Sequence, residues 1–463
     1  MQKKFPTDWK FSKVIPLQKN LKSSSTDRKN YRPVAILSPL SKIMEKAVYQ
    51  QLYNYFTLNR IFHSSIHGYR KNRSTQTALL EMYDKWVQSA HNGQLSGAIL
   101  LDLSSAFDLV SHEILLEKLQ IYGIQPDMLQ WIDSYLSHRS QSVWIDHIYS
   151  SCLSCKVGVP QGSNLGPLFF LIFVNDLPFS LECGMVQYAD DSTLTASGKN
   201  IQEIRDKLEP NCETVRTWMV ENQQKLNPEK THLMLLGTDK RLHFSPEKLQ
   251  VTLGNVLIQE TQDSNELLLG CWIQSNLKWG KHVREITGKL KSRLVALRHL
   301  KYVLPFQQRK ILAEGLVNSV ISYCLPLYGG CNLGEIKDLQ ILQNKSARIV
   351  CHAPRLACRR EMFIYLDWLT VNQMIRYLTL IAVYRVKKTR EPEYFDRTFR
   401  IENHRGNIIV PNTRLSLAKS SFKIRGMEDW NLLPSTVKQL DNIGSFKTAL
   451  RTWIKENTPQ FLD

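Results

Sequence analysis

Two adjacent carboxylates, Asp190 and Asp191, constrain the fold of this chain more than any other feature. They follow a short apolar run, Gly184 to Val186, and precede Thr193-Leu194-Thr195. Asp favours turns and the flanks suit a pleated surface, so the stretch predicts a strand, a tight turn and a second strand. Neighbouring strand residues face opposite ways, so only one carboxylate can lead into a cleft. A site here needs another carboxylate from elsewhere; the alternative is a hairpin with a solvated acidic turn.

The chain is strongly basic. Its 463 residues include 60 Lys and Arg against 42 Asp and Glu, a formal charge of +18, and 43% of them are hydrophobic. This composition predicts a folded protein with a polyanionic partner. Nucleic acid is the first candidate for that partner, and an anionic membrane surface is the second. The N-terminus lacks a signal-peptide core, the apolar run Leu168 to Val174 is too short to cross a bilayer, and nine scattered cysteines suit reduced thiols. We therefore expect an intracellular protein of the cytoplasm and nucleus.

A glycine among cations stands before a predicted helix from about Thr75 to Ser89. The stretch reads His67-Gly68-Tyr69-Arg70-Lys71-Asn72-Arg73-Ser74. Glycine permits close backbone approach, and cations beside a helix N-terminus attract anions. Arg70 and Arg73 are therefore candidates for phosphate binding, with a basic surface loop as the alternative.

A further acid, Asp102, comes near the end of the apolar run Leu95 to Leu103, which predicts a buried strand. A carboxylate there is costly unless it is paired or binds a metal ion. Residues 104–108 then lead into a helix predicted from about Val110 to Leu119. The alternative role for Asp102 is a helix-capping or turn residue.

Other segments complete the predicted framework. A helix begins near Ser41, a plausible N-cap, and Gly, Pro and Asn mark a loop from Gly158 to Pro167. The apolar run Leu165 to Leu177 predicts a buried helix. Another helix spans about 201–223, and Lys230-Thr231 opens a strand at 232–236.

A basic helix is predicted after residue 278. From Lys278 to Lys310 the chain has ten Lys or Arg and one acid, Glu285. Apolar residues from Val283 to Leu297 recur at helical spacing, which leaves a cationic face that suits a phosphate backbone. The cations of that face include Lys281, Arg284, Lys291 and Arg298. A merely solvated basic helix is the alternative.

Five motifs in one order resemble the reverse transcriptases of non-long-terminal-repeat (LINE-type) retrotransposons, and the jockey-like group in particular. They are Asn30-Tyr31-Arg32-Pro33, Leu101 to Asp108, Gly158 to Gly162, Tyr188 to Asp191 and Lys230-Thr231. The resemblance covers the chain from about Trp9 to its end. Two stretches depart from the family pattern. In His67-Gly68-Tyr69-Arg70, His67 replaces the usual aromatic residue, and this change affects the expected packing around the motif. Leu267 to Gly270 lacks the aromatic residue that usually precedes Leu-Gly, and this change affects the expected positioning of the primer.

The resemblance implies an α+β, right-hand polymerase fold with fingers, a palm built on an antiparallel sheet, and a helical thumb. We expect fingers and palm in residues 1–257, the thumb in 258–390 and a small C-terminal extension of unknown role in 391–463. The chain has no endonuclease-sized segment before the polymerase and no ribonuclease H-sized segment after it, so we expect a truncated copy or a fragment.

The resemblance also implies site roles. Two Mg²⁺ ions, which Mn²⁺ could replace, would be bound mainly by the catalytic residues Asp102 and Asp190. Asp191 would be a third catalytic metal ligand and is the weakest of the three assignments. The Leu103 carbonyl would be a further ligand. Phe107 matches a steric gate against ribose, and Lys230 a possible general acid. Nucleotide-binding residues would be Arg70, Arg73, Ser105, Ala106, Phe107 and Gln161, and nucleic-acid-binding residues Lys281, Arg284, Lys291 and Arg298.

The expected function is RNA-directed DNA polymerisation by two-metal-ion phosphoryl transfer to a primer 3′-hydroxyl. Its partners would be an RNA template, a DNA primer and deoxynucleoside triphosphates, with no membrane. The alternative is a catalytically inactive retroelement relic that only binds nucleic acid.

Overall fold

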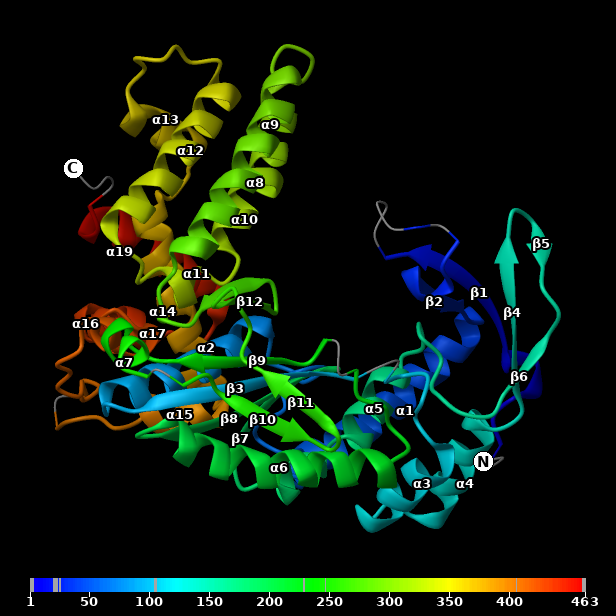
Figure 1. Cartoon of the computed structure of the whole chain (residues 1–463). Coiled ribbons are helices and arrows are strands. Elements are labelled where there is room, and N and C mark those ends of the chain that lie inside the picture. Colours follow the sequence, from blue (N-terminus) through cyan, green and yellow to red (C-terminus); the bar gives the residue numbers. More distant parts are fainter. Residues whose placement is uncertain are drawn as a thin grey trace.

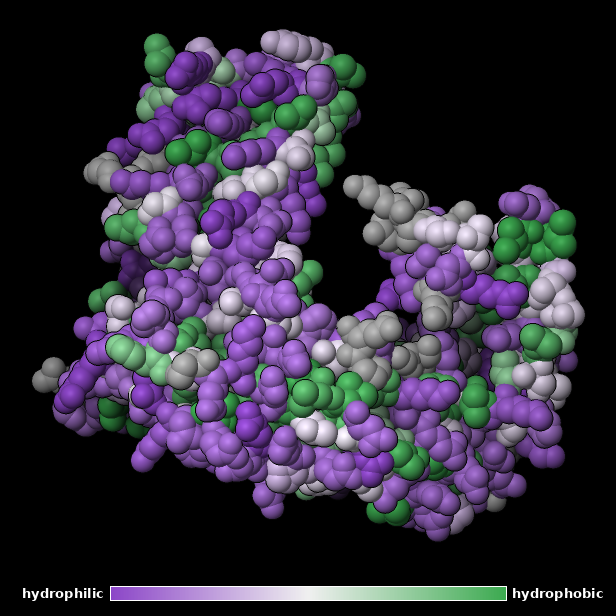
Figure 2. Space-filling view, viewed as in Figure 1, coloured by the Kyte–Doolittle hydropathy of each residue, from purple (hydrophilic) through white to green (hydrophobic). Residues whose placement is uncertain are grey.

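The computed structural model describes residues 4–19, 24, 26–103, 106–227, 230–245, 247–404 and 406–459. Two arms rise from a central sheet, the fingers at the right of Figure 1 and the thumb at the left. The space-filling view shows an open hollow between the arms (Figure 2). The predicted α+β class and right-hand arrangement are confirmed.

The central sheet is antiparallel and carries the acidic motifs. Its strand order is β7 (Gly184–Tyr188), β8 (Asp191–Gly198), β3 (Leu95–Asp102) and β9 (His232–Leu236). Helix α6 (Ile201–Glu221) packs on one face, and α2 (Thr75–His91) packs on the other. Side chains alternate between these two apolar layers, as period-2 strands require. Ile99 and Leu233 belong to the α6 layer, whereas Ala98 and Met234 belong to the α2 layer.

The fingers combine a second sheet with helices. The sheet contains β1 (Phe11–Gln18), β2 (Tyr31–Ile36), β4 (Arg139–Ile145), β5 (Ile148–Tyr149) and β6 (Leu153–Cys155). The helices of this region are α1 (Pro39–Leu58), α3 (His112–Ile121), α4 (Pro126–Leu136) and α5 (Gly166–Phe173). Helix α1 begins earlier than predicted, because Pro39 occupies its first turn after Ser38. Ser41 is buried inside the helix, where its hydroxyl donates to Glu45.

The thumb follows several short elements and is mostly helical. The short elements are α7 (Asp239–His243), β10 (Gln250–Leu253), β11 (Val256–Gln259), β12 (Asn265–Leu268) and β13 (Cys271–Gln274). The thumb helices are α8 (Gly280–His299), α9 (Phe306–Ala313), a π-helical turn (Glu314–Asn318), α10 (Ser319–Ser322), α11 (Leu325–Tyr328), α12 (Leu333–Cys351), α13 (Arg359–Leu366) and α14 (Val371–Thr389).

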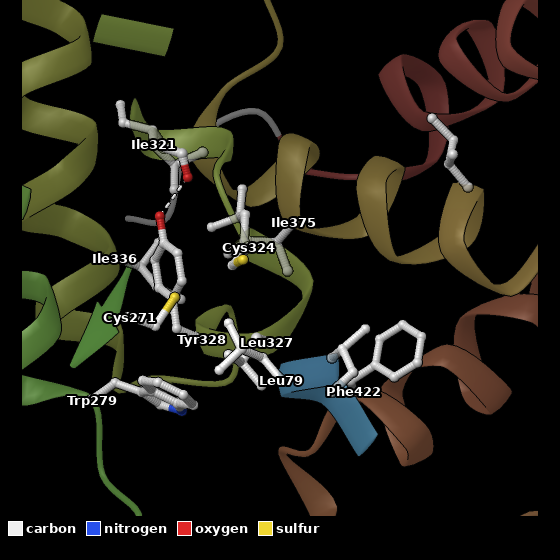
Figure 3. Packing of buried hydrophobic residues seen from close by; sticks show 14 of the residues in the cluster. Leu79, Cys271, Trp279, Ile321, Cys324, Leu327, Tyr328, Ile336, Ile375 and Phe422 are labelled. Atoms are coloured by element: carbon white, nitrogen blue, oxygen red, sulfur yellow. Dashed lines mark hydrogen bonds between the residues drawn. The ribbon is translucent and has the colours of Figure 1, made fainter. Parts of the chain in front are cut away.

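The C-terminal extension packs against both the thumb and α2. Its helices are α15 (Glu393–Phe399), α16 (Ser416–Lys419), α17 (Phe422–Leu432), α18 (Ser435–Lys438) and α19 (Ile443–Asn457). Leu79 of α2, Tyr328 and Ile375 of the thumb, and Phe422 of the extension share one apolar core (Figure 3). The divisions at residues 257 and 390 stay predictions, and the core runs across the second.

Within the described ranges, none of the helices combines the length and the apolar character that crossing a membrane demands.

Candidate active site

The predicted carboxylates meet at one end of the central sheet. Asp102, the last residue of β3, stands directly opposite Asp191, the first residue of β8. Directly opposed residues lie on the same face of an antiparallel pair, with Cβ atoms about 5 Å apart. Asp190 lies in the turn before β8, where Ala189 has a φ of 56°. Asp191, which strand alternation ranked last, is therefore the acid that pairs with Asp102 across the sheet.

The electrostatics of Asp191 reflect this crowding. The surrounding atoms withdraw water from the carboxylate, although the residue as a whole is exposed, and Asp190 and Asp102 add negative charge nearby. These effects raise the pKa of Asp191 to about 6 against the opposing influence of Lys230. The Lys230 ammonium donates to Asp102 Oδ2 at 3.3 Å. The three carboxylates therefore concentrate negative charge, and a bound cation would reduce the repulsion between them.

A divalent cation fits the chemistry of these residues, because hard cations prefer carboxylate oxygens. Among the described residues, however, no three His, Cys, Asp or Glu side chains are already arranged to hold a metal ion. Water and the phosphates of a nucleotide would have to complete the coordination shell, as is usual for Mg²⁺.

The glycine motif forms one wall of the site. The His67 amide donates to the Gln187 carbonyl at 2.8 Å, and the Gln187 amide donates to the Ser65 carbonyl at 3.0 Å. This pairing lays Gly68 against the acidic turn so closely that an added Cβ would lie 2.2 Å from the Ala189 nitrogen. His67, where the family usually has an aromatic, is fully buried and hydrogen-bonds to both Thr77 and Glu81.

Phe107 lies in an aromatic setting beside the carboxylates. Its ring stacks on the buried ring of Phe170, with centroids 4.6 Å apart, and lies nearly perpendicular to the ring of Tyr69, with centroids 6.0 Å apart. Tyr69 as a whole remains 41% exposed, while partial burial of its hydroxyl and the nearby Asp190 raise its pKa. Ala106 is buried. Ser105 lies outside the described residues.

Gln161 lies next to this aromatic group. The Val159 amide donates to the Phe107 carbonyl at 2.9 Å, which fixes the loop to the segment that carries Phe107. Gln161 Nε2 donates to Asp108 Oδ1 at 2.8 Å, and the Gln161 carbonyl accepts from the Ala35 amide at 2.7 Å. The structure therefore brings the segments of Phe107 and Gln161 together, and their predicted contacts with a nucleotide stay predictions.

Arg70 and Arg73 have an unexpected partner. Both guanidinium groups form ion pairs with Glu391, and their side chains are only 9% and 1% exposed. A triphosphate could reach them only if Glu391 moved away, so their predicted contact with phosphate oxygens stays a prediction.

The predicted thumb cations lie on α8, in the arm that faces the fingers across the hollow (Figure 1). Arg284, Lys291 and Arg298 are exposed. Lys281 is half-buried, pairs with Glu285 at 3.0 Å and lies over the Trp272 ring at 5.0 Å. At Leu269, where the family pattern has an aromatic nearby, the Tyr323 hydroxyl donates to the backbone carbonyl at 2.7 Å.

Three neighbours of the site were not singled out from sequence. The aromatic character of Tyr69, inside a recognised motif, was a usable signal. Phe170 was hidden in an all-apolar helix, and Glu391 stands 321 residues from Arg70 with no motif around it. A cavity of about 700 Å³ lies elsewhere, at the base of the thumb, and includes Lys278, Trp279 and Leu417 but none of the three carboxylates.

Comparison with known families identifies the family of this chain. The model of the family described as "Reverse transcriptase (RNA-dependent DNA polymerase)" matches residues 19–276, more than half of the chain. The chain belongs to this reverse transcriptase family. The matched range includes the three carboxylates, Phe107, Gln161 and Lys230 of this reverse transcriptase chain.

Relatives of this reverse transcriptase chain include two polymerases from Drosophila melanogaster. The probable RNA-directed DNA polymerase from transposon BS is 28% identical over 80% of this chain and 41% of its own length. The RNA-directed DNA polymerase from mobile element jockey is 25% identical over 76% of this chain and 38% of its own length. The resemblance to LINE-type, jockey-like enzymes is thereby confirmed. The chain spans about two fifths of the length of these relatives.

Among solved structures, apo telomerase from Candida tropicalis is similar, with a TM-score of 0.43 and 11% identity over 96% of this chain and 69% of that one. Telomerase from Candida albicans, in complex with a fragment of telomeric RNA, has a TM-score of 0.40 and 11% identity over 99% of this chain and 68% of that one.

Proposed function

We propose that this chain copies RNA into DNA by adding deoxynucleotides to a primer 3′-hydroxyl. The observation that carries the proposal is the pairing of Asp102 with Asp191 across β3 and β8, with Asp190 in the adjoining turn. Three acids at one sheet end, inside a reverse transcriptase domain, provide the negative charge that phosphoryl transfer with divalent ions requires.

Asp102, Asp190 and Asp191, with the Leu103 carbonyl, would hold two Mg²⁺ ions, for which Mn²⁺ can substitute. When bound, such ions lower the pKa of the attacking hydroxyl and neutralise charge on the leaving pyrophosphate. Lys230, whose ammonium donates to Asp102, would donate a proton toward the pyrophosphate.

The residues beside the carboxylates would bind the incoming nucleotide. Phe107 would exclude a ribose 2′-hydroxyl, because Phe170 behind it prevents the ring from yielding. Ser105, Ala106 and Gln161 would line the same site, and Arg70 and Arg73 stay candidates for the triphosphate. RNA template and DNA primer would occupy the hollow, where Lys281, Arg284, Lys291 and Arg298 would contact phosphates in a salt-dependent manner.

Primer extension tests the proposal. The protein is incubated with poly(rA)/oligo(dT), deoxythymidine triphosphate and Mg²⁺ or Mn²⁺, and product length is measured while duplex binding is followed separately. Extension supports the polymerase. Duplex binding without incorporation at any protein concentration would support the alternative of an inactive relic.

We expect Phe107→Ala to admit ribonucleotides. Loss of a rigid ring from a shape-selective site changes discrimination by about 10- to 200-fold. The ratio of kcat/KM for deoxy- over ribonucleotide should fall by that factor, measured by single-nucleotide extension. Phe244→Ala removes an exposed ring away from the site and is the matched control. Unchanged sugar selectivity in Phe107→Ala would remove the gate role.

We expect the Mg²⁺ requirement to rise below pH 6. Metal ligation needs the deprotonated carboxylate, and the pKa of Asp191 is raised to about 6. Protons should therefore compete with Mg²⁺, and the half-saturating Mg²⁺ concentration should rise by about tenfold per pH unit below that value. Mg²⁺ titrations of extension at pH 5.5, 6.5 and 7.5 measure this effect, and a half-saturating concentration that does not change with pH would contradict it.

The raised pKa of Asp191 also predicts how the thermal stability of the protein depends on pH. A raised folded-state pKa means that ionised Asp191 opposes folding, an effect absent at low pH and fully present once pH exceeds 6. Without divalent ions, Asp191→Asn should therefore melt at a higher temperature than the parent at pH 7.5. The gap should close as the pH approaches 4.

A further inference from the structure

The C-terminal extension contacts two arginines of the glycine motif through one carboxylate, Glu391. Glu391 lies between the last thumb helix, α14, and α15 of the extension. Its Oε1 accepts from Arg70 Nη2 at 3.2 Å, and its Oε2 accepts from Arg73 Nε at 2.7 Å. Glu391 itself is 27% exposed, so this ion pair is largely withdrawn from solvent.

The two arginines also donate hydrogen bonds to backbone carbonyls just before the glycine motif. Arg70 Nη1 donates to the His63 carbonyl at 3.0 Å, and Arg73 Nη1 donates to the Ile66 carbonyl at 3.0 Å. The segment that they hold, residues 63–67, pairs with Gln187 at the edge of β7. Gly68 then lies on the acidic turn, and Tyr69 meets Phe107.

The negative charge of Glu391 stabilises the two neighbouring arginine side chains. Burial and the neighbouring Arg73 lower the pKa of Arg70 to about 10, and Glu391 opposes that shift. Without the carboxylate, two adjacent guanidinium groups would repel each other in a poorly solvated place. Helix α15, which begins two residues after Glu391, is itself tied to α2, because Tyr394 of α15 donates to the buried Asp84 of α2 at 2.6 Å.

We infer that Glu391 is a positioning residue for the nucleotide-binding wall of the active site. It acts through Arg70 and Arg73, fixing how residues 63–69 lie on the acidic turn and how the Tyr69 ring contacts Phe107. The inference rests on the proposed polymerase function and gives the C-terminal extension a role in it: the extension supplies the carboxylate that completes the wall.

Glu391→Gln tests this role, because the amide keeps the shape and removes the charge. We expect the KM for deoxynucleotide to rise and the selectivity against ribonucleotide to fall, each by about tenfold, a typical coupling between contacting groups. Glu391→Asp, which keeps the charge, should recover part of the effect. The control is Glu393→Gln, two residues on, whose carboxylate pairs with the exposed Arg397.

A double variant separates positioning from general destabilisation. If Glu391 acts through Tyr69, Glu391→Gln should change sugar selectivity by less than about twofold in a Tyr69→Ala background. Independent, multiplying effects would overturn the inference. So would an unchanged KM, or a KM that falls in Glu391→Gln, because a falling KM would mean that Glu391 competes with the triphosphate for the arginines.

Hydrogen exchange tests the same contact without activity. The amides of His67 and Gln187 are hydrogen-bonded across the wall, so Glu391→Gln should accelerate exchange in peptides covering them, and Glu393→Gln should not. Equal exchange in all three proteins would overturn the inference. If the parent protein does not extend primers, the proposed function fails by itself, while this measurement still decides whether Glu391 holds the wall.

Discussion

Asp190→Asn is expected to abolish primer extension while leaving duplex binding nearly unchanged. Asparagine keeps the size of the side chain but removes a charge from the turn that leads into Asp191, which stands opposite Asp102. Charge stabilisation by metal ions amounts to several kcal/mol, and about 1.4 kcal/mol corresponds to a factor of ten in rate. The rate of single-nucleotide addition should therefore fall by about 1,000-fold or more.

Duplex binding provides the internal control for Asp190→Asn. Most of the affinity for a duplex comes from cations on phosphates, so its dissociation constant should change by less than about twofold and keep its salt dependence. Asp206→Asn, at an exposed position of α6, removes an equivalent charge away from the site and should extend primers normally. Substantial extension by Asp190→Asn would refute its assignment as a metal ligand.

Gly68→Ala is expected to damage the site through the backbone. The added Cβ would lie 2.2 Å from the Ala189 nitrogen and 3.0 Å from its Cα, and neither backbone atom can rotate away. Overpacking of this kind costs about 1–3 kcal/mol, and a shift of the acidic turn by about 1 Å can lower the rate about 100-fold. Single-turnover extension and thermal unfolding measure the two effects.

A glycine in open surroundings serves as the control. At Gly315, in the π-helical turn of the thumb, an added Cβ would meet no atom of the described structure within 4 Å. Gly315→Ala should therefore leave extension unchanged. If Gly68→Ala retained the parental rate, the close approach to the turn would not matter for catalysis.

Much of the framework could be predicted from local patterns. The strand ending at Asp102, the strand–turn–strand around Asp190 and the basic helix after residue 278 all appear where expected. Such patterns report which side chains a strand or helix must bury, which is a local property. Ser41 shows the limit: it had the residue type of an N-cap, but Pro39 starts the helix earlier and Ser41 is buried.

The site residues also divide into features that the motifs predict and features that only the three-dimensional structure decides. The motifs predicted roles for the acids, Phe107 and Gln161, because each is a residue type with its own chemistry. Strand alternation alone ranked Asp191 below Asp190, since it considers one strand at a time. The register between β3 and β8, which depends on how two distant strands pair, makes Asp191 the partner of Asp102.

By itself, the amino-acid sequence determined which side-chain types this protein has for its proposed chemistry: carboxylates, an aromatic ring and many cations. Only the tertiary structure decided which carboxylates face each other and that Glu391 engages Arg70 and Arg73 from more than 300 residues away. The physical reason is that side-chain chemistry is local, whereas pairing across a sheet or between two ends of a chain is set by packing of the whole core.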